Sequence, residues 1–452
     1  MDSATLTRSR LALLDGPQAV TADPGDLFTW PIITEEDETA VLEVLRRRAM
    51  SGTDVTMHFE QEYAAWQGSA HALGHSSGTA ALQAAMHACG VGVGDEIICP
   101  SITYWASCLP AYSLGATVVF AEIHPETLCL DPADLERRIT PRTKAIVVVH
   151  YLAHPADMDP IMAIARRHNV KVIEDASHAQ GGLYKGKKIG TLGHVAAASL
   201  MAGKSLAVGE AGMLTTDSRE IYERAAAFGH YERFRSGSDV ETEELRGLVG
   251  LPLGGYKYRM HQLSAAVGRV QLRHYDARIA EIQRAMNYFW DQLEGVPGLR
   301  AHRPPKDSGS TMGGWYAARG HYVPEELGGL SVTRFAQAVR AEGAPCSPGV
   351  NAALHLHPLF SSADVYGHGR PTRIANATGD TSHLSQPAGS LPISEGIGAR
   401  TFSIPWFKHH RPEQIDQYVR AFRKVADSHQ ELLADDPGNP PQLGGWHFFQ
   451  HR

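Results

Sequence analysis

Short apolar runs and helix-like segments alternate through the first half of the chain. The runs that predict β-strands, rich in Val, Ile and other apolar residues, lie at 71–74, 96–100, 117–120, 143–150 and 170–173. Segments with the helical spacing of apolar residues lie at 80–89 and 160–168. Such alternation is typical of a mostly parallel sheet with helices on both of its faces. The sequence therefore predicts an α/β fold with a large domain built around this sheet.

The two ends of the chain predict a different organisation. Thr34 precedes four acids at 35–38, the pattern of a capped helix start, so an extended arm followed by a helix is expected. Beyond Gly298 a strand-like run and two helical segments predict a smaller α/β domain, interrupted by a long loop at 361–390. The expected division is an N-terminal arm and helix at 1–49, a large domain at 50–275, a small C-terminal domain at 276–434 and a Pro/Gly-rich tail at 435–452. The aromatic residues of this tail leave open whether it is disordered or packs on a partner.

Composition narrows the classes of function. The 452 residues are 43% hydrophobic and 20% charged with a formal net charge of −7, so no basic surface for nucleic acid is expected. No apolar run approaches the roughly 20 residues that span a bilayer, and the apolar stretch near the N-terminus is too short for a signal peptide. Five cysteines without a Cys-x-x-Cys pair favour a reducing cytoplasm over a disulfide framework. The 24 histidines are scattered, so no metal site is expected.

One lysine, Lys204, lies in a run of small and apolar residues at 199–212. Burial disfavours the ammonium form and lowers the pKa, which frees the amine to attack a carbonyl. Taken alone, the run favours a surface lysine on a Gly/Ala loop, because lysines are mostly exposed. Upstream, a strand-like run ends on Asp175, which is either a helix N-cap or a side chain at the ligand-binding edge of the sheet. Pyridoxal 5'-phosphate needs both parts: a lysine for its aldehyde and a carboxylate that keeps its pyridine nitrogen protonated.

A strand, a turn and a helix follow one another directly within 71–89. The turn ends on Ser77, Gly78 and Thr79, where the helix starts. N–H groups at a helix start attract anions, and a glycine lets the backbone approach them closely. Ordinary capping of the helix by Ser77 or Thr79 is the alternative. Beside the lysine and the acid described above, we assign Gly78 and Thr79 to the phosphate of the cofactor and include Ser77 among the cofactor-binding residues.

Five motifs, spread between about Trp30 and about Ala426, carry a resemblance in combination. They are Ser-Ser-Gly-Thr-Ala-Ala-Leu at 76–82, Pro-Ser-Ile-Thr-Tyr at 100–104, Glu-Asp-Ala at 174–176, Ser199 with Lys204, and Gly-Tyr-Lys-Tyr-Arg-Met at 255–260. Together they resemble the DegT-type family of pyridoxal-phosphate sugar and cyclitol aminotransferases, a branch of the aspartate aminotransferase fold (fold type I). The form Lys-x-Leu-x-x-Gly-Glu at 204–210 is closest to the cyclitol and aminoglycoside-precursor members.

The resemblance implies further contacts with the cofactor. Tyr104 stands in the position of the aromatic side chain that stacks on the cofactor ring, although the residues alone leave Trp105 as a competitor. His178 stands where the family commonly has Gln, which contacts the 3'-oxygen, and a histidine can also donate one hydrogen bond. Ser199 matches the phosphate-binding serine of the family.

The resemblance also implies a homodimer. Lys257 stands where the family has an Asn that reaches the cofactor phosphate of the partner subunit. A cation suits a phosphate dianion, but Lys257 could instead meet an anionic substrate or remain a solvated loop lysine. His355 occupies the usual histidine position near the substrate mouth. The further substrate candidates are His357, Tyr258 and Arg259.

The main hypothesis is a cytoplasmic aminotransferase that moves an amino group from L-glutamate or L-glutamine to a keto-sugar or keto-cyclitol, in secondary metabolism such as the biosynthesis of aminoglycoside-like antibiotics or amino sugars. Lys204 would act as general acid and base, and the kinetics would be ping-pong through pyridoxamine phosphate. Three departures from the family, at Lys257, His178 and Ala211, leave open another pyridoxal-phosphate reaction such as elimination, epimerisation or C–C cleavage. A third interpretation is a non-catalytic regulator with the same fold. Similar dehydratases carry His in place of the lysine, so a dehydratase is not expected.

Overall fold

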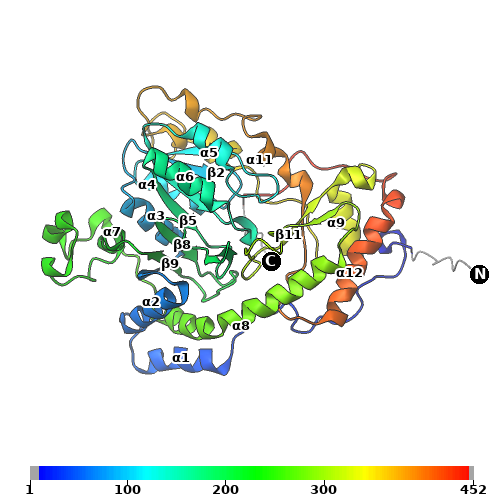
Figure 1. Cartoon of the computed structure of the whole chain (residues 1–452), viewed down its shortest axis with the longest axis horizontal. Helices are drawn as coiled ribbons and strands as arrows, with labels where there is room; N and C mark the ends of the chain where they lie inside the picture. Colours follow the sequence, from blue (N-terminus) through cyan, green and yellow to red (C-terminus); the bar gives the residue numbers. More distant parts are fainter. Residues whose placement is uncertain (1–9, 447–452) are drawn as a thin grey trace, which may run out of the picture.

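A seven-stranded sheet lies at the centre of the computed structural model, which describes residues 10–446 (Figure 1). In order across the sheet, the strands are β1 (His71–His75), β9 (Gly212–Thr216), β8 (Val195–Ser199), β5 (Lys171–Asp175), β4 (Thr143–Val149), β2 (Glu96–Pro100) and β3 (Thr117–Ala121). Strand β9 runs antiparallel to both of its neighbours, and the other six run parallel to one another. The predicted α/β class with a mostly parallel sheet is confirmed.

Strands β8 and β9 are missing from the sequence prediction. Strand β8 reads Val-Ala-Ala-Ala-Ser, and Ala is depleted in strands, so the pattern carries little β signal. The strand forms because its backbone pairs with β5 on one side and with β9 on the other. Its position matters for the site, because the end of β8 lies beside the end of β5.

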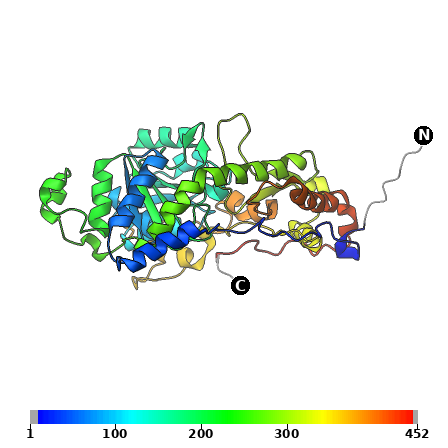
Figure 2. The ribbon, with the colours of Figure 1, turned by 90° about the horizontal axis from the view of Figure 1, so that it is seen from below.

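The helices are α1 (Glu35–Arg46), α2 (Asp54–Gln67), α3 (Gly78–Ala88), α4 (Pro110–Ser113), α5 (Pro132–Arg138), α6 (Met158–His168), α7 (Arg219–Gly229), α8 (Gln262–Gln292), α9 (Val332–Ala341), α10 (Pro358–Ser361), α11 (Pro392–Gly396) and α12 (Pro412–Asp427). Helix α3 packs on β8 and on α7. The long helix α8 runs from the large sheet to α12 and so links the two ends of the molecule (Figures 1 and 2). Within residues 10–446, every helix is too short or too polar to span a bilayer.

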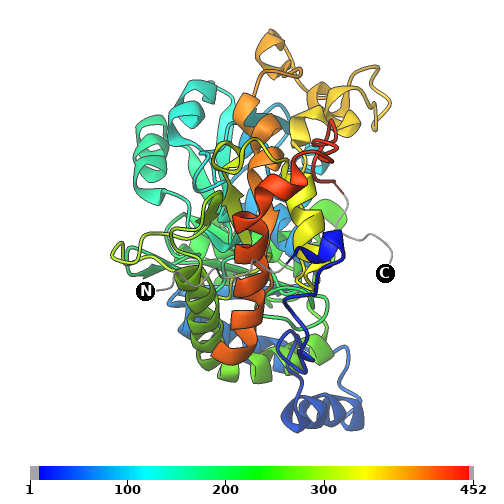
Figure 3. The ribbon, with the colours of Figure 1, turned by 90° about the vertical axis from the view of Figure 1, so that its right-hand side faces the viewer.

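The large sheet and its helices enclose one hydrophobic core, and a second hydrophobic core lies beside it. Its sheet has three antiparallel strands, β10 (Leu299–Ala301), β11 (Arg319–Tyr322) and β12 (Thr401–Ser403), and α9 and α12 pack with it. Leu11 and Leu27 from the start of the chain belong to this core, and the N-terminal arm lies along α12 (Figure 3). A small hairpin of β6 (Leu183–Tyr184) and β7 (Lys187–Lys188) completes the strands.

The segment at 350–397 packs on the core of the large sheet, through residues such as Phe360 and Leu391. Its predicted loop at 361–390 contains only single turns of 3-10 helix, besides the end of α10. Residues 436–446 lie against this same chain, because Asp436 accepts hydrogen bonds from Ser331 and Trp446 packs on His357. Phe448 and Phe449 of the tail lie outside the described residues. The predicted domain boundaries stay a prediction.

Candidate active site

A cavity of about 190 Å³ lies at the carboxyl ends of β5 and β8, beside the start of α3. Residues assigned from the sequence to the cofactor line this cavity: Ser77, Gly78, Thr79, Tyr104, Asp175, His178, Ser199 and Lys204. The sheet topology explains the meeting, because parallel strands present their carboxyl ends at one edge and α/β proteins bind ligands there. The structure thus gathers groups from well-separated segments of the chain.

Lys204 lies in the loop between β8 and β9, and its side chain is buried in the cavity. The main-chain N–H of Lys204 donates to the carbonyl of Met201 at 2.8 Å, which closes a tight turn. Burial lowers the pKa of Lys204 to about 8, and the negative charge of Asp175 opposes part of this effect. The lowered pKa increases the fraction of the amine that is neutral and nucleophilic near physiological pH. The surface-lysine alternative does not hold in this structure.

Asp175 is the last residue of β5, and its carboxylate is held from two sides. The hydroxyl of Ser107 donates to Oδ2 at 2.7 Å, and the main-chain N–H of Ser177 donates to Oδ1 at 3.1 Å. The chain after Asp175 forms turns and no helix, so the helix-cap alternative is wrong here. The two bonds orient a buried carboxylate at the floor of the cavity.

The start of α3 forms the opposite wall. Ser77 caps the helix, since its hydroxyl accepts from the main-chain N–H of Ala80 at 3.1 Å. The N–H groups of Gly78 and Thr79 belong to the first turn, where a helix offers no internal acceptor. A Cβ on Gly78 would lie 2.6 Å from the Cβ of Ser199, so a glycine is required for the close approach of α3 and β8. Capping and anion binding are therefore compatible at this turn.

An aromatic ring and a histidine complete the predicted set. Tyr104 lines the cavity, whereas Trp105 is not among the lining residues, which favours Tyr104 for the ring contact. His178 is buried, and burial holds its pKa well below the usual range. Its Nδ1 accepts from the main-chain N–H of Leu152 at 3.3 Å, so the neutral ring carries its proton on Nε2 and can donate there.

Other predicted residues lie away from this cavity within the chain. Lys257 is exposed on the Gly-rich loop and is not among the lining residues. The hydroxyl of Tyr258 donates to Gln83, and Arg259 forms an ion pair with Glu232 at 3.2 Å. The roles of these three residues toward cofactor, substrate or partner stay predictions.

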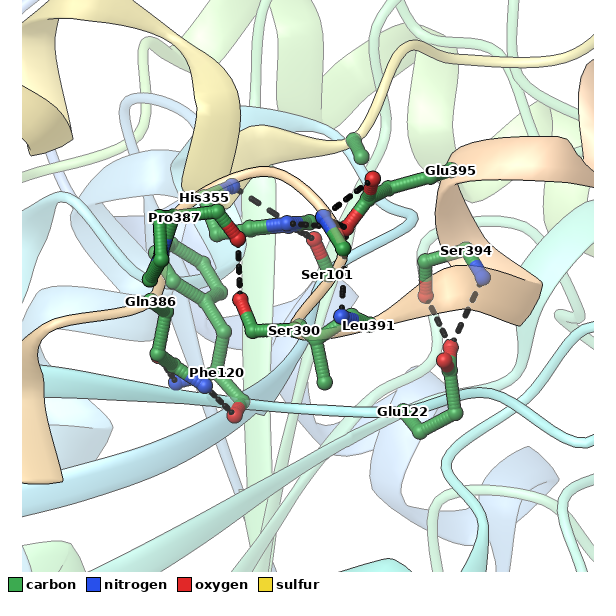
Figure 4. A network of polar contacts seen from close by, with 12 residues as sticks. Ser101, Phe120, Glu122, His355, Gln386, Pro387, Ser390, Leu391, Ser394 and Glu395 are labelled. Atoms are coloured by element: carbon green, nitrogen blue, oxygen red, sulfur yellow. Dashed lines mark hydrogen bonds and ion pairs between the residues drawn. The ribbon is translucent and has the colours of Figure 1, made fainter.

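His355 is fully buried and is not among the residues that line the cavity. Figure 4 shows its polar contacts. Its Nδ1 lies 2.7 Å from the hydroxyl of Ser101, and its Nε2 lies 3.1 Å from Oε1 of Glu395. His357 caps α10 through its Nδ1, which accepts from the main-chain N–H of Leu359 at 3.0 Å. In this conformation both histidines serve the packing of the segment at 350–397, and their substrate roles stay predictions.

Sequence reasoning missed several residues at the site. Ser107 holds Asp175, and Tyr316 lines the cavity with its ring 4.0 Å from the Nζ of Lys204. Trp30 donates its indole N–H to the carbonyl of Lys204 at 2.8 Å. No local pattern marks these side chains, because each one belongs to a segment remote from the residue that it contacts.

These features fit pyridoxal 5'-phosphate. A desolvated lysine suits its aldehyde, a buried carboxylate suits its pyridine nitrogen, and the first turn of α3 suits its phosphate. In residues 10–446, no group of three or more His, Cys, Asp or Glu is arranged to hold a metal ion. The lysine, the carboxylate and the helix start that line the cavity are the groups that this organic phosphate cofactor needs.

Comparison with known proteins agrees with this fit. Residues 31–382 match the model of the DegT/DnrJ/EryC1/StrS aminotransferase family. The chain is 33% identical over 416 residues to an L-glutamine:2-deoxy-scyllo-inosose aminotransferase of Micromonospora echinospora, with 89% of this chain and 95% of that protein covered. It is 39% identical over 371 residues to a GDP-perosamine synthase of Caulobacter vibrioides, with 82% and 89% covered.

A solved structure repeats the architecture. The aminotransferase from Psychrobacter cryohalolentis superimposes with a TM-score of 0.75 at 27% identity, with 89% of this chain and 99% of that chain covered. The arrangement of the large sheet, the second core and the cavity between β5, β8 and α3 is therefore that of a fold type I enzyme. The chain belongs to the DegT/DnrJ/EryC1/StrS aminotransferase family and is a pyridoxal-phosphate-dependent aminotransferase.

Proposed function

We propose that this aminotransferase takes the amino group of L-glutamine or L-glutamate and transfers it to the carbonyl carbon of a keto-cyclitol or keto-sugar. The names of two relatives support this range: one names L-glutamine and a keto-cyclitol, and the other names a GDP-linked amino sugar. The product would then serve the biosynthesis of amino sugars or of aminoglycoside-like antibiotics.

Lys204 and Asp175 carry the chemistry in this proposal. Pyridoxal phosphate supplies an aldehyde and an electron-accepting ring when it is bound. The neutral amine of Lys204 would hold the aldehyde. Once the donor has displaced it, the free amine of Lys204 would move the proton of the donor's Cα as general base and general acid. Asp175 would accept the N–H of the pyridine ring, and its bonds from Ser107 and Ser177 keep the carboxylate in place.

The remaining lining residues hold and orient the cofactor. Gly78 and Thr79 offer main-chain N–H groups to the phosphate, and the hydroxyls of Ser77 and Ser199 lie on the same wall. Tyr104 provides a ring face, and His178 can donate from Nε2. The observation that carries the whole proposal is the desolvated Lys204 in one cavity with the carboxylate of Asp175.

The lining of the cavity favours an uncharged acceptor. The described residues that line the cavity include no arginine, the side chain that binds phosphate groups through bidentate hydrogen bonds. Glu210 lines the cavity and offers a carboxylate to the hydroxyl groups of a cyclitol or sugar. We therefore take a free keto-cyclitol, the class of acceptor in the name of one relative, as the preferred acceptor in this proposal.

The working unit in this proposal is a homodimer in the cytoplasm. Residues 230–255 extend away from the sheet, and the exposed Lys257 follows them (Figures 1 and 2). This loop would reach the cofactor phosphate of the partner subunit. All five cysteines are unpaired and buried, which suits a reducing compartment.

The test is an absorbance titration of the purified protein with pyridoxal phosphate, followed by L-glutamine or L-glutamate. We expect a band of lysine-bound cofactor that disappears with the donor while a 2-oxo acid is released in one equivalent. Lys204→Ala should show neither change, and Lys171→Ala, an exposed lysine, should behave as the wild type does.

A second step identifies the acceptor. The donor-treated protein is mixed with 2-deoxy-scyllo-inosose or with a nucleotide-linked 4-keto sugar, and the return of the band is followed. Recovery with the cyclitol alone supports the preferred acceptor, and recovery with the nucleotide sugar alone contradicts it. A band that ignores both donors would instead favour a pyridoxal-phosphate reaction other than transamination.

A further inference from the structure

Aromatic side chains from distant parts of the chain contact Lys204 at both of its ends. The indole N–H of Trp30, on the N-terminal arm, donates to the carbonyl oxygen of Lys204 at 2.8 Å. The ring of Tyr316, just before β11, faces the other end, with its centroid 4.0 Å from Nζ. The backbone and the amine of one residue are therefore held from outside the large sheet.

A third ring connects these two contacts. The centroid of Trp406 lies 5.9 Å from that of Trp30 and 5.9 Å from that of Tyr316. The indole N–H of Trp406 donates to the carbonyl of Gly314 at 2.9 Å, which anchors the ring to the segment that carries Tyr316. The three aromatic residues thus form one connected group, which we term the aromatic clamp.

The backbone around Tyr316 is under strain. Its two neighbours, Trp315 and Ala317, have φ values of 56° and 51°, in the left-handed region of the backbone that residues other than glycine rarely adopt. Gly314 lies so close to the Lys204 loop that a Cβ there would stand 2.3 Å from the Cβ of Ser205. Strained backbone conformations persist only where the surrounding structure holds them in place, and they are common at functional sites.

We infer that Trp30, Tyr316 and Trp406 position Lys204 for its reaction, and that the face of Tyr316 holds the amine whenever it is not bonded to the cofactor. This inference rests on the proposed role of Lys204. The face of an aromatic ring attracts an ammonium group, so Tyr316 stabilises the protonated amine and guides it to one place in the cavity. The hydrogen bond from Trp30 keeps the main chain of the loop from shifting when the amine moves.

Other charged and titratable groups face the same amine and must be held constant in a test. Asp175 at the end of β5 favours the protonated amine, and Glu210 lines the cavity from the loop before β9. Tyr104 and His178 line the cavity as well, and the charge of Arg319 on β11 acts on His178. The variants below leave all five unchanged.

The first test measures the pKa of the Lys204 amine in the protein without cofactor. Competitive acetylation with limiting acetic anhydride, read by peptide mapping, reports the pKa of each lysine separately. We expect Tyr316→Leu, which keeps an apolar side chain but removes the ring face, to lower the pKa of Lys204 by roughly 0.5 to 1 unit. Tyr316→Phe keeps the face, so its Lys204 should titrate as in the wild type.

The result is decisive in either direction. A Lys204 pKa in Tyr316→Leu that equals or exceeds the wild-type value would overturn the role of the ring face. The side chain at position 316 would then affect the amine only by excluding water from it. Tyr316→Met serves as a second apolar variant if Tyr316→Leu folds poorly. The exposed Lys171 is the internal reference in every sample.

The second test addresses Trp30. Trp30→Phe keeps a ring beside Trp406 and removes the N–H that bonds to Lys204. We expect at least tenfold faster amide hydrogen exchange within residues 201–208 and a lower kcat with an unchanged KM for the donor. Trp66→Phe is the matched control, because it removes an indole N–H that donates to Asp276 at 2.8 Å on an exposed surface.

Equal exchange in Trp30→Phe and Trp66→Phe would remove Trp30 from the clamp. The proposed function fails separately, if the wild-type protein forms no lysine-bound cofactor band at all. The pKa and exchange measurements need no bound cofactor, so the two failures are distinguishable.

Discussion

At the scale of single residues, two buried lysines, Lys204 and Lys408, differ in the groups that surround their amines. Lys204 shares a cavity with Asp175, whose negative charge offsets part of the desolvation. Lys408 is buried against the rings of Trp30 and Trp406, and its Nζ has no hydrogen-bond partner among residues 10–446. Burial lowers the pKa of Lys408 well below its ordinary value. Of these two lysines, Lys204 is the one that combines a desolvated amine with an adjacent acid and open space.

We expect Lys408→Met to stabilise the protein by roughly 1 kcal/mol or more near pH 6, because Met fills similar volume without a buried amine. The pKa of Lys408 is lower in the folded than in the unfolded protein, so the unfolded state binds more protons between those two values. Wild-type stability therefore falls as the pH drops from about 10.5 through this window, and the variant should lose that dependence. Urea unfolding at about pH 6, 8 and 10 measures both effects.

Lys171→Met is the control, since Lys171 is exposed at the start of β5. A Lys408→Met protein that is less stable and keeps the wild-type pH slope would mean that the amine has a binding partner in solution.

Local sequence predicts only part of the site at this scale. Some site residues lie close together in the sequence, so a short motif can identify them: Ser77, Gly78 and Thr79 are consecutive, and Asp175 and His178 are three positions apart. Tyr316 and Trp30 meet Lys204 through tertiary packing, and neither belongs to a local pattern. His355 shows the reverse case, because a motif position suggests substrate binding while the structure buries the ring between Ser101 and Glu395.

At the scale of elements, the contact of α3 with β8 and β9 builds the wall of the cavity that we assign to the cofactor phosphate. Gly78 stands against Ser199, and Gly212 stands against the carbonyl of Ser77, where an added Cβ would lie 2.2 Å away. Both glycines are therefore required for close approach of backbone to backbone. The wall therefore depends on the absence of a Cβ at these two glycines as well as on the side chains that line it.

We expect Gly78→Ala to weaken the affinity for pyridoxal phosphate at least tenfold. The new methyl group must push α3 from β8, which misdirects the N–H groups of the first helical turn. Equilibrium titration of the cofactor absorbance gives the dissociation constant. Gly396→Ala is the matched control, because a Cβ there meets no atom within 4 Å. Equal affinities in the two variants would contradict the assignment of this wall to the phosphate.

A second element-scale contact ties α11 to the large sheet. Glu122, after β3, accepts from the main-chain N–H group of Ile393 at 2.9 Å and from that of Ser394 at 2.8 Å, and Figure 4 shows Glu122 beside Ser394. The carboxylate is thus the acceptor that these helix-start donors require.

We expect Glu122→Gln to destabilise the protein by about 1–2 kcal/mol, since an amide NH₂ would face N–H donors. Urea unfolding measures the loss, and limited proteolysis should show faster cleavage within 361–390. Glu294→Gln, at an exposed glutamate, is the control. Unchanged proteolysis would mean that α11 is held by apolar packing alone.

At the scale of the whole molecule, two cores share one chain that crosses between them. The N-terminal arm packs with the second core, and α8 links that core to the large sheet. The cavity receives Tyr316 from the segment before β11, while its other assigned residues come from the large sheet and its connections. Any relative motion of the two cores would therefore move the ring of Tyr316 against Lys204.

We expect mixed dimers of Lys204→Ala and Lys257→Ala to regain activity. If Lys257 serves the partner's site, each mixed dimer has one complete site, and an equal mixture refolded together should reach about a quarter of wild-type activity. Transamination is measured after co-refolding, with each variant refolded alone as the control. No regain would mean that Lys257 acts on its own subunit or on neither site.

Sequence alone determined the α/β class and the strands with strong apolar patterns, and it predicted the roles of Lys204, Asp175 and the 76–79 turn, because these rest on local patterns and short motifs. The tertiary structure decided that β8 is a strand, since an alanine-rich run needs β5 and β9 to pair with. It also decided the burial of Lys204, the place of His355 and the aromatic clamp. These properties depend on contacts between distant segments, and such contacts exist only once both cores have formed.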